Sequence, residues 1–360
     1  MNTTTTTTEE IPLQPSTDDE WLVPYLFFLL VMGTIGNTCG VLIFLNSSMR
    51  KYSCSLYFLL MSIFDEIYLF FWITNRLSQY LTDEQLRNRS TFICKVFVLT
   101  TYCSAQAAIG MLVLATFDRL YTTVKIARGH FDVRLVHHRR RFQNISLCIF
   151  FLTMIGFDAP LFGAQLVSPD DDGSYYCIIV NFEITRIYSI IDLCLYAIIP
   201  RTFMLIADIL ILYHIRKSRA RVISIHDDKK RRERQLSIML AVTSIISLII
   251  VSPYSVLTVL NNFIDLPDDS YGTLYILNNI FGLLSTFTHA MHFYLFLIIS
   301  STIRQHFKVV LKSFVFICSK KRNAIRPATI PVKETRTTTF QRAFNILPSL
   351  PAFPSTKQFP

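Results

Sequence analysis

The stretch from Cys94 to Arg119, CKVFVLTTYCSAQAAIGMLVLATFDR, decides what kind of chain this is. As a helix it is roughly 37 Å long, enough to cross a bilayer with a little to spare at each face. A thiol stands at one end of this crossing. An adjacent acid and base, Asp118 and Arg119, stand at the other end, just before a basic loop.

The composition extends this interpretation to the whole chain. Of 360 residues, 51% are hydrophobic and 30 are Phe, and the mean hydropathy is +0.40. Such a chain is too apolar for a soluble domain, so we expect an all-α membrane protein, a seven-transmembrane helix bundle within residues 22–302. The apolar runs long enough to span a membrane are approximately 22–45, 55–75, 94–117, 143–166, 185–213, 236–260 and 273–299.

Basic residues give the orientation of the bundle. Residues 1–21 contain no Lys or Arg, and the loops after the second, fourth and sixth runs carry few. The other loops hold Arg50, Lys51, Lys125, Arg128, Arg134, Arg139, Arg140, Arg141, Arg216, Lys217, Arg219, Arg221, Lys229, Lys230, Arg231, Arg232 and Arg234. The positive-inside bias places the N-terminus outside and the C-terminus in the cytoplasm. The net charge of +10 is then a topology signal that also attracts membrane lipid, and we expect no nucleic-acid partner.

The N-terminal residues 1–21 are Thr-rich and polar, which predicts a disordered extracellular segment without a cleavable signal peptide. Asn2 begins one candidate glycosylation sequon there, and Asn88 begins another in the first outer loop. Chance sequons are common, so an unmodified asparagine is an equal alternative at each position.

Beyond the last span, residues 303–318 are basic and amphipathic, typical of a short cytoplasmic helix on the membrane surface. Cys318 at its end is a candidate for lipidation, with a free thiol as the alternative. Residues 319–360 are rich in Pro, Ser and Thr and predict a disordered cytoplasmic tail.

Asp65 lies in the middle of the second span. A carboxylate at that depth is costly unless it faces the bundle interior and has polar partners. We therefore expect Asp65 to face Asn37 and the seventh span, with a protonated, structural Asp as the alternative. Cys94 and Cys177 are the thiols that we expect on the oxidising outer side, where they can form a disulfide.

Taken together, these features resemble a rhodopsin-like (class A) G-protein-coupled receptor, over about residues 22–310. Gly36-Asn37, Asp65, the Cys94–Cys177 pair, Pro200 and Pro253 match the family pattern, as does Asp118-Arg119-Leu120 with Leu in its last place. The resemblance implies a plasma-membrane receptor, not an enzyme, that signals to heterotrimeric G proteins, with arrestin and a receptor kinase as further partners.

The resemblance also implies a cytoplasmic switch. Glu233 stands 20 residues before Pro253, where many such receptors carry an acid that pairs with the box arginine, here Arg119. Outward movement of the sixth span would release that arginine. A solvated Glu233 is the alternative. Asp208 replaces the tyrosine that usually holds the released arginine, so we expect it to receive Arg119 by a charge-assisted bond.

The seventh span departs from the family. His292-Phe293-Tyr294-Leu295-Phe296 stands in place of Asn-Pro-x-x-Tyr and looks like a variant of some invertebrate neuropeptide receptors. His292 could pair with Asp65, and we place His289 in the same intramembrane polar core; a merely structural histidine is the alternative. Ala108 stands where a sodium-ligating serine is common. We expect no metal site and no cofactor.

Two ligand classes can be excluded because the residue that each requires is absent. The last span has no Lys for retinal, and Thr101 replaces the aspartate of amine receptors. Acids in the outer loops favour a cationic or amidated peptide, with a small environmental chemosensory ligand or solvated loop acids as alternatives. The expected pocket residues are Thr101, Tyr102, Gln106, Asp192, Asn262 and Asn278.

The alternatives to a receptor are an enzyme and a transporter or channel. No recognisable catalytic motif occurs in the chain, which argues against an enzyme. A seven-span proton-linked transporter or channel could use Asp65, Asp192, Arg201 and His292 as a relay. The sequence shows no internal repeat of the kind that transporters carry.

Overall fold

The computed structural model describes residues 21–46, 49–50, 54–127, 134–167, 175–179, 181–219, 227–263 and 268–324. Asn2 and the expected 325–360 portion of the tail lie outside these residues. The chain divides into two units, Met1–Leu311 and Lys312–Pro360. The first unit contains the helix bundle, and the second contributes the described end of the last helix.

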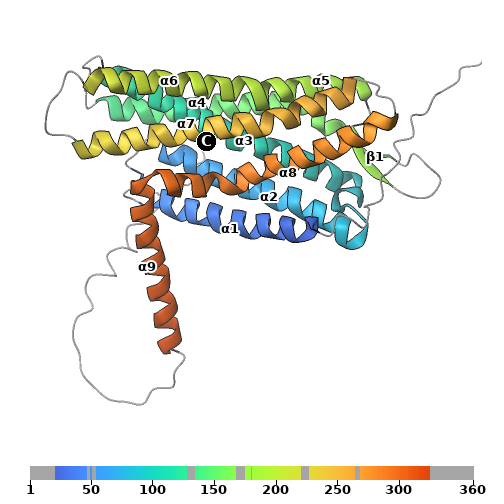
Figure 1. Ribbon diagram of the computed structural model, residues 1–360, viewed down its shortest axis with the longest axis horizontal. Helices are drawn as coiled ribbons and strands as arrows, with labels where there is room; N and C mark the ends of the chain where they lie inside the picture. The colour runs from blue at the N-terminus through green and yellow to red at the C-terminus, as the bar shows by residue number, and fades with distance from the viewer. Residues whose placement is uncertain are drawn as a thin grey trace, which may run out of the picture. The chain divides into compact units, whose positions relative to one another are not determined.

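Helices account for nearly all of the described secondary structure, with one short hairpin (Figure 1). In chain order the elements are α1 (Leu22–Leu45), α2 (Ser55–Thr82), η2 (Leu86–Asn88), α3 (Thr91–Ala127), α4 (Arg134–Phe157), η3 (Ala159–Gly163), β1 (Ala164–Val167), β2 (Tyr176–Ile179), α5 (Phe182–Asp192), η4 (Leu193–Ile198), α6 (Ile199–Arg219), α7 (Asp227–Phe263), α8 (Asp268–Ile299) and α9 (Ser301–Ala324).

Seven segments in the described chain are long and apolar enough to cross a membrane, which confirms the seven expected spans. Several helices continue beyond the predicted apolar run. The third, for example, is helical from Thr91 to Ala127. Hydropathy marks only the part of a helix that needs an apolar solvent, whereas its backbone hydrogen bonds continue into the interface.

The fifth span is composed of three segments joined end to end. α5 is followed by the π-helical segment η4 and then by α6, with Pro200 in the first turn of α6. Proline has no N–H to donate to the preceding turn. A regular α-helix through Pro200 would lack one backbone hydrogen bond. The wider π-helical turn at η4 accommodates the chain just before this position.

The outer hairpin is tied to the start of α3. β1 and β2 are antiparallel, with Leu166 opposite Cys177. Cys177 forms a disulfide with Cys94, and the two Cα atoms are 5.6 Å apart. This confirms the predicted bond. The backbone N–H of Cys177 also donates to Asn88 Oδ1 at 3.0 Å. A glycan on Asn88 would attach through the amide nitrogen and leave this oxygen available as the acceptor.

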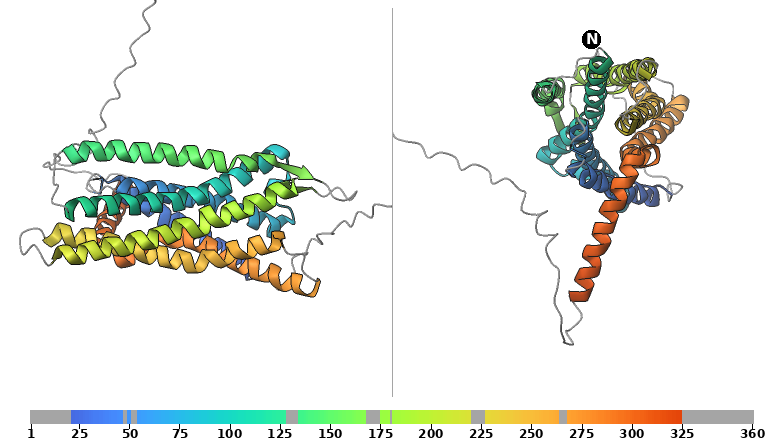
Figure 2. Two further views of the ribbon diagram at one scale, coloured as in Figure 1. Left: turned by 90° about the horizontal axis from the view of Figure 1, so that it is seen from above. Right: turned by 90° about the vertical axis from the view of Figure 1, so that its left-hand side faces the viewer.

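The side chains inside the bundle form two apolar clusters, around Phe58 and Met239 and around Leu69 and Val251 respectively. Many large apolar residues, such as Ile149 and Ile249, are instead exposed, as is required of surfaces that face lipid. α4 lies at the edge of the bundle and buries the smallest share of its span (Figure 2). The bundle core is thus formed mainly by the other six spans.

The helix expected at 303–318 begins two residues earlier, at Ser301, and continues to Ala324. The Ser300 hydroxyl accepts from the Ile303 N–H at 3.3 Å, and Ser300 separates α8 from α9. Ile303 is fully buried, and the Phe307 ring contacts Phe293 with centroids 5.9 Å apart. Cys318 lies within α9, but its side chain lies outside the described part of the structure.

Gly110 allows α3 to approach α4 closely. A Cβ placed there would lie 2.0 Å from the Phe150 ring, whereas a Cβ at Gly156 would meet nothing within 4 Å. Gly110→Ala should therefore force the ring to move, at a cost of about 1–3 kcal/mol, and lower the thermal midpoint of the purified protein. Gly156→Ala is the matched control, and it should leave the midpoint unchanged or raise it through helix propensity. Equal midpoints for the two variants would contradict the close packing of α3 on α4.

Candidate functional site

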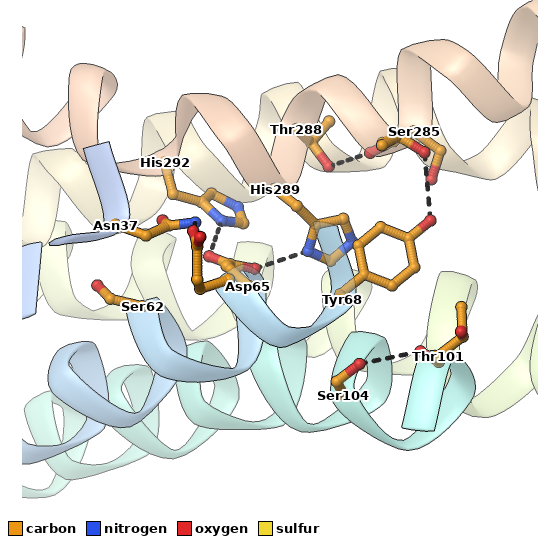
Figure 3. A network of polar contacts seen from close by, with 12 residues as sticks. Asn37, Ser62, Asp65, Tyr68, Thr101, Ser104, Ser285, Thr288, His289 and His292 are labelled. Atoms are coloured by element: carbon orange, nitrogen blue, oxygen red, sulfur yellow. Dashed lines mark hydrogen bonds and ion pairs between the residues drawn. The ribbon is translucent and has the colours of Figure 1, made fainter. Parts of the chain in front are cut away.

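The centre of the bundle is occupied by an acid held between two imidazoles (Figure 3). Asp65 on α2 lies 2.6 Å from His289 Nδ1 through Oδ1 and 2.8 Å from His292 Nδ1 through Oδ2. The two histidines are three residues apart on α8, so they lie on the same helix face. All three side chains are at most 1% exposed. Both carboxylate oxygens therefore have a partner where an unpaired charge would be most costly.

A second set of contacts fixes His289. Its Nε2 lies 3.2 Å from the Tyr196 hydroxyl, and the Tyr68 ring lies 4.4 Å away between centroids. An ionised carboxylate can only accept hydrogen bonds. With Asp65 ionised, His289 Nδ1 carries the hydrogen and Nε2 accepts from Tyr196. The imidazole is thus held from both sides, by α2 and by the fifth span.

Asn37, expected to face Asp65, has a different polar partner. Its amide donates to Glu66 Oε2 at 3.3 Å, and the Thr34 hydroxyl donates to Glu66 Oε1 at 2.8 Å. Glu66 was not among the residues expected in the polar core. The available signal was its position next to Asp65, because a second carboxylate at this depth also needs donors. The residues on α1 supply them.

The half of the bundle that contains the end of α3, expected on the cytoplasmic side, carries the Asp-Arg box. Asp118 and Arg119 are both buried, and Arg119 Nη2 donates to Cys54 Sγ at 3.0 Å. Asp208, which we expect to receive Arg119 in the active state, accepts from the Ser244 hydroxyl on α7 at 3.2 Å through Oδ2. Glu233 belongs to α7, but its side chain lies outside the described part of the structure.

The outer half of the bundle contains a second polar network. Gln106 donates to the Tyr188 hydroxyl at 3.2 Å, and that hydroxyl donates to Asp158 Oδ1 at 3.0 Å. The Cys103 thiol donates to Asp158 Oδ2 at 3.2 Å, and the Tyr102 ring meets Tyr188 edge-on. Asp158 was not expected in this network, although it lies within the predicted fourth apolar run, 143–166, where an acid needs polar partners.

Of the six expected pocket residues, the structure brings Tyr102 and Gln106 together through Tyr188. Asp192, at the end of α5, interacts with Gln106 and with the charge of Asp158. The others have local partners: the Thr101 carbonyl accepts from Ser104, the Asn262 carbonyl accepts from Arg186, and Asn278 Oδ1 accepts from Thr258.

The structure gives Arg201 a position that the spacing of the sequence did not. Its side chain is fully buried, its Nη1 donates to the carbonyls of Tyr196 and Ala197, and its guanidinium lies 4.9 Å from the Tyr196 ring. Both carbonyls belong to the π-helical segment η4, whose wider turn changes the regular hydrogen-bond pattern. The π segment and the buried cation therefore stabilise each other.

Seven spans, an outer disulfide and a buried Asp-Arg pair at the inner end of α3 define a seven-helix membrane receptor. Residues 36–312 match the model of the 7 transmembrane receptor (rhodopsin family). Because this match covers most of the chain, the protein belongs to that family, which consists of G-protein-coupled receptors and not of enzymes. No curated protein matches the sequence.

Removal of the central carboxylate charge should destabilise the bundle. In Asp65→Asn only one side-chain oxygen remains to accept, so one imidazole must move its hydrogen to Nε2 and accept from the new amide. Two bonds to an ionised carboxylate are thereby replaced with weaker neutral ones. We expect the free energy of unfolding to fall by about 1–3 kcal/mol, measured as a lower thermal midpoint in detergent. Ser62→Ala is the control, because Ser62 is buried one turn away and bonds only its own helix, at Phe58 O. If both variants melt at the same temperature, the paired imidazoles do not stabilise the fold.

Proposed function

We propose that this chain is a plasma-membrane receptor that transmits the binding of an extracellular cationic or amidated peptide to cytoplasmic heterotrimeric G proteins. Family membership supports signalling through G proteins. The nature of the ligand and the residues that switch the receptor are inferred from the two polar networks at the ends of the bundle.

The environment of Asp208 is the observation that carries the switching proposal. Asp208 is 1% exposed, and its Oδ1 has no hydrogen-bond partner among the described residues. A buried carboxylate oxygen without a donor is costly. The Ser244 hydroxyl that reaches its other oxygen comes from α7, the sixth span. Outward movement of α7 would remove this donor as well.

In the active conformation the Arg119 guanidinium would then donate the hydrogen bonds that the Asp208 carboxylate lacks. A guanidinium presents several N–H groups to both carboxylate oxygens and forms bonds about twice as strong as neutral ones. The exchange of Ser244 for Arg119 would thus stabilise the open form of the cytoplasmic side. This gives the receptor two states that differ in a defined set of contacts.

Basal and ligand-stimulated G-protein activation would test this switch. We expect Arg119→Ala to abolish activation across the Gα classes and Asp208→Asn to lower it at least about tenfold, which corresponds to losing about 1.4 kcal/mol of a charge-assisted bond. The readout is nucleotide exchange in cells, normalised to receptor at the surface. Thr122→Ala is a nearby control, because its hydroxyl bonds only the Asp118 carbonyl on its own helix. Normal signalling in Asp208→Asn would exclude the exchange.

The outer network supports a cationic ligand. Asp192 and Asp158 lie within electrostatic reach of one another, and Asp158 already has two donors. We infer that Asp192 is the acid that meets the ligand, because its charge also acts on both members of the aromatic pair Tyr102 and Tyr188. An acid beside aromatic rings is suited to an ammonium or guanidinium group. A small cationic chemosensory molecule would share this chemistry.

A library of synthetic amidated peptides that carry Arg or Lys, with Glu-containing counterparts, would test the ligand class. For any active peptide we expect Asp192→Asn to raise the half-maximal concentration by about 10–100-fold, the effect of losing a buried charge pair. Glu183→Gln makes the same change in charge at a largely exposed position, paired with Arg186 at 4.0 Å, and should shift the response little. Equal shifts for both variants would mean that Asp192 does not contact the peptide.

A further inference from the structure

The three side chains at the centre of the bundle also have the composition of a metal site. Asp65, His289 and His292 each present a ligand atom, and these atoms all lie within 4.8 Å of one another. They come from two helices, α2 and α8, and all three side chains are buried. We propose that Asp65, His289 and His292 bind a divalent transition-metal ion of the zinc type.

The donor set selects the class of metal. Two of the three ligands are imidazole nitrogens, which suit zinc and its neighbours, whereas alkali and alkaline-earth ions prefer oxygen. Two histidines with one carboxylate, and a fourth position left for water, is a known zinc ligand set. The residues thus fit zinc and not the hard cations that a lone carboxylate would attract.

Only small movements separate the hydrogen-bonded cluster from a coordinated one. Ligand atoms about 2.0–2.2 Å from a tetrahedral zinc are roughly 3.3 Å apart, compared with 2.6 and 2.8 Å for the two hydrogen bonds here. The zinc would replace the hydrogens on the two Nδ1 atoms, and each neutral ring would then carry its hydrogen on Nε2. The ligand atoms of the two imidazoles lie within 4.8 Å of one another, so the two rings must also close on the metal.

The surroundings supply the outer contacts that metal-bound histidines require. The Tyr196 hydroxyl lies 3.2 Å from His289 Nε2 and can accept its hydrogen in the metal-bound form. His292 Nε2 and Asn37 Oδ1 are both buried and have no hydrogen-bond partner among the described residues. Asn37 and His292 are drawn in the same polar network (Figure 3). When Asp65 is ionised, His292 Nε2 and Asn37 Oδ1 are both acceptors, so the cluster lacks hydrogen-bond donors.

In the metal-bound form His292 Nε2 carries a hydrogen and becomes a donor, so Asn37 Oδ1 is the acceptor that remains. A metal-bound water or hydroxide would add a further donor to the cluster. Charge favours the hydroxide, because zinc with one carboxylate and one hydroxide is neutral overall, and burial of a net charge in the bundle would be costly. Zinc lowers the pKa of its bound water to about 7, so hydroxide is accessible near neutral pH. Metal binding would thus turn one of the two orphan acceptors, His292 Nε2, into a donor and leave Asn37 Oδ1 to accept.

The test is direct binding of Zn²⁺ to the full chain, purified with an affinity tag that contains no histidine and treated first with a chelator. Because the ligands are buried, exchange should be slow and the protein must be equilibrated before unbound metal is removed. We expect one tightly held Zn²⁺ per chain in the wild type. In His292→Ala the affinity should fall by at least about 100-fold, since even outer-shell partners contribute 10–100-fold.

Two further variants make the outcome decisive. His214→Ala removes a histidine of α6 that lies outside the cluster, next to Tyr213, and should bind Zn²⁺ as the wild type does. His292→Cys replaces imidazole with another zinc ligand. It should therefore retain the metal and, with Co²⁺ as the probe, show a thiolate-to-cobalt charge-transfer band.

Three results would overturn the proposal. The first is no bound Zn²⁺ in folded wild-type protein. The second is equal binding in the wild type and His292→Ala, which would place the metal elsewhere. If His292→Ala does not fold, the absence of the cobalt band in folded His292→Cys is the third. Because the readout is metal binding and not signalling, its failure is distinct from failure of the proposed receptor function.

Discussion

The free-energy cost of a charge inside the hydrocarbon layer is the constraint on which this structure depends. Asp65 stands at the middle of α2, and its two oxygens are matched by His289 and His292 of α8, at 2.6 and 2.8 Å. Tyr196 of the fifth span holds the far side of His289. Three spans are therefore fixed relative to one another by a single carboxylate, in a bundle whose apolar surfaces alone would allow them to slide past one another.

The same constraint explains the other buried polar groups. Glu66 takes its donors from α1, Arg201 takes its acceptors from the π-helical turn of its own span, and Asp158 takes donors from α3 and α5. Two of the buried charged groups are incompletely matched in the described part of the chain: Oδ1 of Asp208 and two guanidinium nitrogens of Arg201 have no partner. Only Asp208 shares a half of the bundle with the Asp-Arg box. An incompletely matched charge is the kind of group that a second conformation can satisfy. This is why we assign Asp208 to the switch and Asp65 to the permanent core.

The departures from the family pattern acquire a physical meaning in this arrangement. Histidine at 292 replaces an amide with an imidazole, and His289 adds another on the same helix face. The pair converts an oxygen-rich environment, suited to hard cations, into a mixed nitrogen and oxygen environment. It also gives the seventh span two bonds to the second span. The contacts between α2 and α8 and the proposed metal site thus involve the same two residues.

The sequence alone determined the class of protein, because the length of each apolar run and the position of the charges follow directly from the thickness and the field of a bilayer. It also determined contacts for which only one pair of residues was a candidate, such as the Cys94–Cys177 bond. Which polar groups meet across the bundle was decided by tertiary structure. Asn37 pairs with Glu66, and Asp158 joins Tyr188, because the rotation of each helix about its axis is set by the packing of all its neighbours, and no spacing along a single helix encodes it.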